Sequence, residues 1–294
     1  MSRPVRPFDY HEPTTLGEAL DLLQRHAGEA HVMAGGTALV LLMAQGLARP
    51  GYVVGLRRIE ALRGIRRGPD GGLELGALVT HAEAERSPEV AAYCPALRSA
   101  FAEVATVRIR NQATVGGSLA HADPAQDPPP VLLALEGAVL AASPRGRRRI
   151  PLSELFLGFF QTSLAPDEVI TAVVLPPPAD RASAAYLKFL PRTHDDYATV
   201  SVAVWLQRDL QGRCERARIA LGAAGPVPLR ARRAEGLLRG ARLDAEAVAA
   251  AAAAVRDEVE PLDDARGSAA YKREMARVWT GRALRRALAA EVPG

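Results

Sequence analysis

Two glycine pairs, far apart in the chain, stand in contexts that favour binding of an anion. The first, Gly35-Gly36, follows the apolar residues 31–34 and precedes Thr37 and a helix-forming segment, 39–44. The first amides of a helix have no partners within it, and glycines let another group approach the backbone closely. This arrangement suits a diphosphate, with Thr37 capping the helix or donating its hydroxyl. A tight turn without a ligand would explain the same residues.

The second pair, Gly116-Gly117, lies in residues 114–130, TVGGSLAHADPAQDPPP. Because glycine and proline weaken or forbid regular structure, we expect neither a regular helix nor a central strand in this segment. Apolar residues 131–135 follow at once, so the segment leads into a buried element. We therefore interpret it as a second turn with a bare backbone.

Hydroxyl and carboxyl side chains surround this second pair. Thr114 and Ser118 flank it, and Asp123 and Asp127 follow. A carboxylate accepts hydrogen bonds from sugar or ribityl hydroxyls, although aspartates at these places would equally cap a loop. Two glycine-rich turns together with a hydroxyl-accepting acid predict a site for a dinucleotide between two subdomains.

Signatures of several other site chemistries are absent from the sequence. Neither G-x-G-x-x-G nor G-x-x-x-x-G-K-[ST] occurs, so a Rossmann site and a P-loop are unsupported. H-E-x-x-H and G-x-S-x-G are also absent, while a Cys–His pair or a Ser–His–Asp triad stays open. Cys94 and Cys214 are far apart, so we expect two small core residues and no iron–sulfur cluster held by this chain alone.

Length and charge indicate a globular protein without a nucleic-acid partner. The 294 residues are 48% hydrophobic and suffice for two domains. The net charge of +4 comes from 37 basic and 33 acidic residues, which are interspersed, and the basic run 145–149 is not interleaved with aromatics. No apolar run approaches the roughly 20 residues that span a bilayer. The N-terminus lacks the apolar core of a signal peptide, so we expect a cytoplasmic location.

The elements that would position the two pairs follow from periodicity and turn residues. Strands at 31–34 and 52–55 enclose the helix 39–44, and a triple proline, 176–178, predicts a domain boundary. Before it we expect strands at 73–78, 138–142, 148–150 and 168–175, and helices across 88–104 and 131–135. Beyond it, strands at 184–190, 199–208 and 216–221 precede helices near 229–238, 244–259 and 268–290. That order is typical of an α+β domain with helices on one face of an antiparallel sheet.

Three stretches resemble the FAD-binding medium subunit of molybdenum hydroxylases, the group of carbon monoxide, xanthine and aldehyde dehydrogenases. They are AGGTALVLLM (34–43), IRNQATVGGSLAHADPAQDPPPVLLAL (109–135) and KFLPRTHDDYATVSVAV (188–204). The resemblance spans nearly the whole chain and implies an α+β fold. It implies a vanillyl-alcohol-oxidase-type FAD-binding domain, 1–178, of two subdomains (about 1–56 and 57–178). A C-terminal domain of antiparallel strands and helices, 179–294, would follow.

The resemblance also assigns residues to a non-covalent FAD, and no catalytic residue or metal ligand. They are Val32, Met33, Ala34, Gly35, Gly36, Thr37, Ala38 and Leu39 in the first turn; Thr114, Gly117, Ser118 and Asp127 in the second; and Ala105, Val169, Lys188 and Tyr197 elsewhere. Two positions depart from the family pattern: Ser118 stands where relatives usually have Asn, and Ala38 where a polar residue is usual. Tyr197 would stack on the flavin ring, or alternatively pack on the core.

The function implied by the resemblance is electron transfer. A small subunit with iron–sulfur clusters and a large subunit with the molybdopterin cofactor would be partners. FAD on this chain would pass electrons to an acceptor such as NAD⁺, a quinone or oxygen. Two alternatives stay open: a self-sufficient flavin oxidoreductase of the vanillyl-alcohol-oxidase type, and a non-catalytic nucleotide-binding module.

Overall fold

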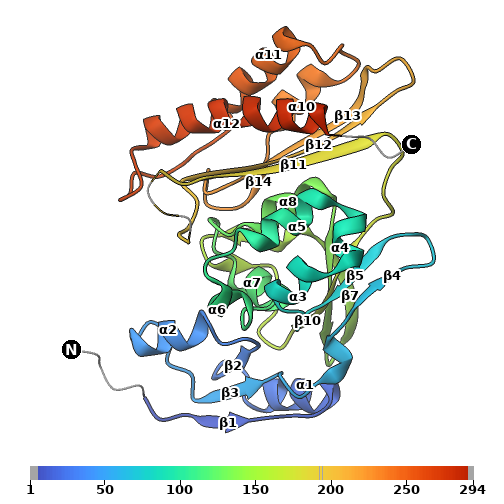
Figure 1. Cartoon of the computed structure of the whole chain (residues 1–294). Helices are drawn as coiled ribbons and strands as arrows, with labels where there is room; N and C mark the ends of the chain where they lie inside the picture. The colour runs from blue at the N-terminus through green and yellow to red at the C-terminus, as the bar shows by residue number, and fades with distance from the viewer. Residues whose placement is uncertain (1–5, 192, 194, 291–294) are drawn as a thin grey trace.

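The computed structural model describes residues 6–191, 193 and 195–290. Figure 1 shows three layers, with the N-terminal elements in blue at the bottom, a cyan to green middle layer, and the C-terminal elements in yellow to red at the top. Each layer contains its own main β-sheet, of three, five and four strands respectively. Strands and helices are therefore mixed in every layer, and the predicted α+β class is confirmed.

The bottom layer is a small unit that carries the first glycine pair. Its three strands are parallel and lie in the order β1-β3-β2. The elements are β1 (Asp9–His11), α1 (Leu16–Arg25), β2 (Ala30–Met33), α2 (Leu39–Ala44) and β3 (Tyr52–Gly55). Helix α1 buries Ala19 and Leu23, which are four residues apart and therefore share one face. As predicted, β2 leads through a short turn into α2.

The middle layer is built on an antiparallel sheet of order β4-β5-β10-β6-β7. Its strands are β4 (Ile65–Arg67), β5 (Leu73–Gly76), β6 (Ala138–Ser143), β7 (Gly146–Pro151) and β10 (Val169–Leu175), with a small hairpin of β8 (Phe156–Gly158) and β9 (Gln161–Thr162). Its helices are η1 (Glu60–Leu62), α3 (His81–Arg86), α4 (Pro88–Tyr93), α5 (Pro95–Ala102), α6 (Val107–Arg110), α7 (Val115–His121), α8 (Pro128–Ala134) and α9 (Leu152–Leu155). Leu75, Val139 and Val173 belong to the core that these helices share with the sheet.

The expectation that residues 114–130 form no helix is wrong, because the segment contains all of α7 and the first turn of α8. Gly116 lies in the first turn of α7, where its missing Cβ lets the helix pack directly on Ala77. The three prolines occupy the first three positions of α8, where backbone N–H groups have no helical partner in any case. The predicted burial of the following residues is confirmed.

The top layer is an antiparallel sheet of order β11-β12-β13-β14, followed by three helices. Its elements are β11 (Ala182–Phe189), β12 (Val200–Arg208), β13 (Cys214–Gly222), β14 (Leu229–Arg230), α10 (Arg232–Leu238), α11 (Ala245–Val255) and α12 (Ala269–Ala289). The sequence placed a helix from residue 229, whereas residues 229 and 230 form a fourth strand. Cys94 and Cys214 are free and buried, as predicted.

Both faces of the top sheet are covered, which explains the nearly continuous apolar run of β12. Val202, Val204 and Leu206 pack with the three C-terminal helices. Ala203 and Trp205, on the opposite face, belong to the core of the middle layer. The top and middle layers are therefore joined by one apolar core.

Polar contacts reinforce this joint at one end. Arg218 on β13 is 8% exposed, and its Nη2 donates to Glu136 Oε2 at 2.6 Å. Its guanidinium also lies 4.1 Å from the centroid of the Trp205 ring. Glu136 adopts a left-handed backbone conformation, with φ of 55°, as it turns the chain from α8 toward β6. The ion pair thus links the two layers, while the cation–π contact holds the Arg218 guanidinium against the top sheet.

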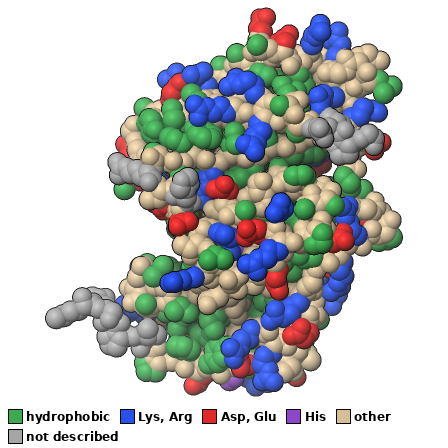
Figure 2. All heavy atoms as spheres, in the orientation of Figure 1, with side chains coloured by type: hydrophobic (Ala, Val, Ile, Leu, Met, Phe, Trp, Pro, Cys, Tyr) green, Lys and Arg blue, Asp and Glu red, His purple; other side chains and the backbone are tan. Residues whose placement is uncertain are grey.

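Charged residues are interspersed over the face drawn in Figure 2, where blue and red atoms alternate across all three layers. Among the described residues, no helix combines the length and apolar character needed to cross a membrane.

Candidate functional site

The two glycine-bearing segments meet in space, although they are about 80 residues apart in the chain. A Cβ on Gly35 would overlap the backbone carbonyl of Gln112, just before α7. A Cβ on Gly117 would lie 3.4 Å from the Cβ of Ala34. The bottom and middle layers therefore touch at this point, as a shared ligand site requires.

The physical role of the glycines differs from the one that the sequence indicated. Gly35 and Gly116 leave out a side chain so that the backbone can approach protein atoms, at Gln112 and Ala77 respectively. Gly36 is needed for another reason, because its φ of 73° lies in the left-handed region. Gly35 therefore permits the contact between the two segments, while Gly116 permits α7 to pack within the middle layer. Any ligand contact is made by the groups that remain exposed around them.

The first segment offers a row of backbone donors. Within the described residues, the amides of 35–38 donate to no protein acceptor, and these residues are only partly buried. Ala38 precedes α2 and forms no side-chain cap, so Thr37 does not cap this helix as the sequence suggested. Consecutive open N–H groups of this kind suit a phosphate group.

The second segment does not offer such donors. The amides of Val115 and Gly116 donate to the carbonyls of Val79 and Ala77, each at 2.9 Å. The amides of Gly117 and Ser118 both donate to Thr114, to its Oγ1 at 3.1 Å and its carbonyl at 2.9 Å. The prediction of a second bare-backbone cradle is thus wrong in its chemistry, because protein carbonyls and the Thr114 side chain already accept from these amides. The side chains are what this segment presents.

A buried histidine that the sequence did not single out holds one of these side chains. The Nε2 of His81 lies 2.7 Å from the Oγ of Ser118, and His81 is 1% exposed. A bridge between Thr80 and Thr114 aligns the starts of α3 and α7 and places the two residues together. Burial, and then the charge of Arg110, lower the pKa of His81 to about 4. The pair is 37 residues apart, and no local pattern could reveal it.

Asp127 is buried and fully engaged by protein donors. Its Oδ1 accepts from the Tyr186 hydroxyl at 2.5 Å, and its Oδ2 from Lys188 Nζ at 3.0 Å. Lys188 also donates to the carbonyl of Glu103 at 2.8 Å. Burial raises the pKa of Asp127 to about 6, because desolvation outweighs the nearby ammonium and the hydrogen bonds from Tyr186 and Lys188. The carboxylate that we expected to accept ligand hydroxyls instead links the middle layer to the top sheet.

Alternation along β11 explains why a lysine lies in an apolar strand. Tyr186 and Lys188 are two residues apart and share the face toward the middle layer, while Ala185 and Leu187 pack with the C-terminal helices. Only two of the 37 basic residues are lysines, so this position stands out in the sequence.

The remaining predicted residues surround this region in different ways. Ala105 has a φ of 38°, and its carbonyl accepts from Arg110 Nη1 at 2.8 Å. Val169 begins β10 and is 3% exposed in an apolar cluster that the bottom and middle layers share. Tyr197 is half-exposed, with the Arg266 guanidinium 5.7 Å from its ring centroid. Its stacking on a flavin stays a prediction.

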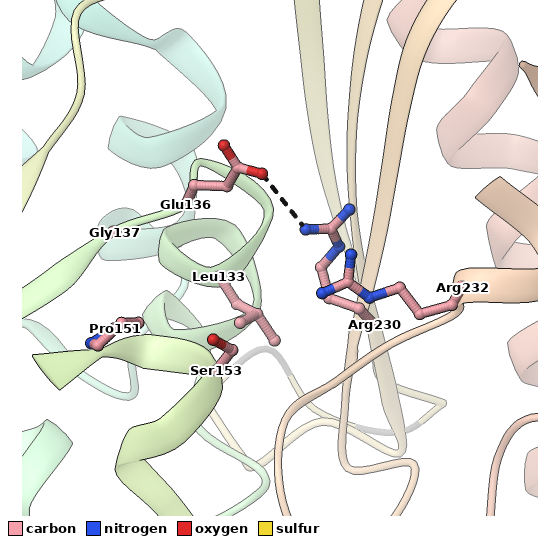
Figure 3. A pocket seen from close by; sticks show the side chains of 7 residues that line it. All are labelled: Leu133, Glu136, Gly137, Pro151, Ser153, Arg230 and Arg232. Atoms are coloured by element: carbon pink, nitrogen blue, oxygen red, sulfur yellow. Dashed lines mark ion pairs between the residues drawn. The ribbon is translucent and has the colours of Figure 1, made fainter. Parts of the chain in front are cut away.

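A separate pocket of about 220 Å³ lies where the middle and top layers meet near β14 (Figure 3). Figure 3 shows Arg230 reaching toward Glu136 across it. Arg230 donates to both carboxylate oxygens of Glu235, at 2.6 and 2.7 Å, and lies 3.8 Å from Glu136. The buried arginine is therefore already matched by acidic side chains, and none of the predicted site residues lines this pocket.

Comparison with known families agrees with this arrangement of layers. Residues 6–178 match the model of the FAD-binding domain in molybdopterin dehydrogenase, and residues 185–287 match that of the carbon monoxide dehydrogenase flavoprotein C-terminal domain. The chain therefore belongs to the FAD-binding subunit family of molybdopterin dehydrogenases, and the predicted resemblance is confirmed.

Particular relatives are similar over nearly their whole length. The chain is 38% identical to subunit alpha of the 6-hydroxypseudooxynicotine dehydrogenase complex of Paenarthrobacter nicotinovorans, covering 96% of this chain and 94% of that one. It is 36% identical to the carbon monoxide dehydrogenase medium chain of Hydrogenophaga pseudoflava, covering 96% and 97%. A solved structure of that organism's carbon monoxide dehydrogenase superposes with a TM-score of 0.94 at 37% identity, covering 98% and 99% of the two chains.

The crossing of the two segments predicts the effect of adding one methyl group. In Gly35→Ala the new Cβ meets the backbone of Gln112, which cannot rotate away, so we expect a loss of about 1–3 kcal/mol in the free energy of unfolding. Gly236→Ala in α10, where nothing lies within 4 Å, is the control, with an expected gain of roughly 0.5–1 kcal/mol. Urea denaturation measures both. Equal stability of Gly35→Ala and wild type would contradict the crossing.

The buried ion pair predicts a non-additive pair of variants. Lys188→Met leaves the Asp127 carboxylate buried without its cation, at a cost of about 3–5 kcal/mol. Adding Asp127→Asn removes the stranded charge, so the double variant should be more stable than Lys188→Met alone. Lys272→Met is the matched control and should cost less stability, because the carboxylate of its partner Asp264 is partly exposed and stays solvated without the cation. If the double variant is less stable than Lys188→Met, an unpaired Asp127 charge is not the cause of the instability of Lys188→Met.

The depressed pKa of His81 predicts a pH-dependent stability difference. Between the folded value of about 4 and the unfolded value near 6.5, the unfolded chain binds a proton that the folded chain does not. The wild type should therefore lose stability relative to His81→Gln as the pH falls from 7 to 4, by up to about 3 kcal/mol. Urea denaturation of both proteins at several pH values gives the difference. A constant difference would show that His81 titrates normally in the fold.

Proposed function

We propose that this chain is the FAD-binding electron-transfer subunit of a molybdenum-containing hydroxylase or dehydrogenase. The observation that carries the proposal is the meeting of two segments that both offer hydrogen-bond donors. They lie in a chain that matches the two family models over residues 6–178 and 185–287. The amides of 35–38 donate to no acceptor in the part of the chain that the structure describes, and the Ser118 hydroxyl stands next to the glycine that contacts Ala34. FAD would supply the redox chemistry, and this chain would bind and orient it.

We assign the residues around the cofactor by what each can donate. The amides of 35–38 would hold the diphosphate, with Val32–Leu39 shaping the turn. Ser118 and Thr114 would contribute hydroxyls, and Ala105, Val169 and Tyr197 would lie nearer the flavin. Asp127 would act indirectly, by holding Lys188 in place, since both of its carboxylate oxygens already accept hydrogen bonds from protein groups.

The partners follow from the same assignment. The relatives are named as a subunit of a dehydrogenase complex and as a medium chain. We propose that an iron–sulfur subunit delivers electrons to FAD on this chain, and that a large molybdenum subunit oxidises the substrate. The final acceptor would be NAD⁺, a quinone or oxygen.

We further propose that the chain divides at 176–178. Residues 1–178 would bind FAD, in subdomains of about 1–56 and 57–178, and residues 179–294 would form the C-terminal domain. The first family match ends at residue 178 and the second begins at residue 185, and no strand of the three main sheets runs through 176–178.

The proposal predicts a yellow protein. The purified chain should carry about one FAD, released on denaturation, and should bind FAD far more tightly than ADP or NAD⁺ because the flavin end adds contacts. Absorbance spectra and equilibrium titration measure these quantities. A colourless chain that takes up no FAD on reconstitution would falsify the proposal. Turnover of an organic substrate by the isolated chain would favour a self-sufficient oxidoreductase instead.

A further inference from the structure

His81 and Ser118 form a buried pair next to the point where the two segments cross. His81 is the first residue of α3, its ring packs 5.6 Å from that of Phe101, and its Nε2 lies 2.7 Å from Ser118 Oγ. Ser118 is only partly buried and follows Gly117, which contacts the first segment through Ala34. One end of the pair is therefore sealed in the core, and the other faces the candidate site.

The other ring nitrogen decides which atom of the pair carries the shared proton. His81 Nδ1 is buried and has no hydrogen-bond partner within the described part of the chain. A neutral imidazole has one N–H, at Nδ1 or at Nε2. A proton on Nδ1 would leave a buried donor unpaired, which proteins tolerate less than an unused acceptor. The proton therefore belongs on Nε2, from which it is donated to Ser118 Oγ.

This choice fixes what Ser118 can do. Its oxygen accepts from the histidine, and its hydroxyl hydrogen has no acceptor among the described residues. The amides of the first turn of α7 already donate to protein carbonyls and to Thr114. The Ser118 hydroxyl is thus the donor that α7 retains for a ligand acceptor.

We propose that His81 is a positioning residue that donates Nε2–H to Ser118 and thereby orients the Ser118 hydroxyl as a donor to bound FAD. The proposal rests on the proposed function of the chain. It assigns to this site a buried residue that does not itself touch the cofactor. The acceptor on FAD would be a phosphate or a ribityl oxygen, since the chemistry of the donor suits both.

A double-variant cycle on FAD affinity tests the coupling. His81→Phe removes the donor and keeps a ring against Phe101, and Ser118→Ala removes the hydroxyl. Each alone should weaken FAD binding about tenfold, which is the loss of one hydrogen bond to a charged or strongly polar group. Both together should weaken binding little more than either alone. His81→Gln, whose amide restores a donor, should recover most of the affinity.

The controls separate positioning from folding. Ser99→Ala, on an exposed helical serine whose hydroxyl donates to the carbonyl of Pro95, should leave FAD affinity unchanged. Fluorescence titration gives the dissociation constants, and thermal unfolding of each apo-protein reports whether the fold is intact. Losses that multiply to about a hundredfold in the double variant would show independent residues and overturn the inference.

A second measurement does not depend on the Phe variant folding. In ¹⁵N-histidine-labelled wild type, the imidazole nitrogen shifts of His81, assigned by their loss in His81→Gln, should show the Nε2–H form at pH 7. An Nδ1–H form overturns the inference directly. A wild type that binds no FAD removes the proposed function and this inference together. Normal FAD binding with additive variants or the Nδ1–H form removes the inference alone.

Discussion

The close crossing of two backbone segments, at Gly35 with Gln112 and at Gly117 with Ala34, is the contact on which the candidate site depends. It brings the turn after β2 against the start of α7, so that donors from the bottom and middle layers lie together. No side chain fits between the segments at Gly35, and the backbone cannot give way as a flexible side chain would. The site therefore exists only while the two layers keep this contact. The packing of the bottom layer on the middle layer sets the geometry of the site.

The two segments contribute different chemistry because their backbone amides differ in whether they already have protein hydrogen-bond acceptors. Residues 35–38 precede the first turn of α2, and their N–H groups donate to no acceptor among the described residues. At α7 the Thr114 cap and the carbonyls of Ala77 and Val79 satisfy the first amides, so a hydroxyl remains instead. Two sequences that look alike as glycine pairs thus offer a row of amides in one case and an oriented hydroxyl in the other.

Local patterns in the sequence could predict most strands, the α+β class and the importance of both glycine pairs. They failed where a contact with a distant residue decided the outcome. The glycine and proline content of 114–130 argued against helices, but Gly116 is needed for packing on Ala77 and the prolines occupy positions that lack helical partners. The histidine beside Ser118 and the two donors on Asp127 come from 37 and about 60 residues away. Such pairings are set by the tertiary fold, and no spacing rule contains them.

The buried pair of Asp127 and Lys188 extends the site into the top layer. Both side chains are almost fully excluded from solvent, at 6% and 2% exposure, so separating them would leave a charge in a poorly solvated place. Tyr186 adds a second bond from the same strand, and the apolar core around Trp205 is shared between the layers. Moving the top sheet away would disturb the Glu103 carbonyl, two residues before Ala105, and the start of α8 together. The C-terminal sheet therefore supports the site structurally and is not an independent domain in this respect. Substitutions on its face toward the middle layer should change the affinity of the two segments for their ligand.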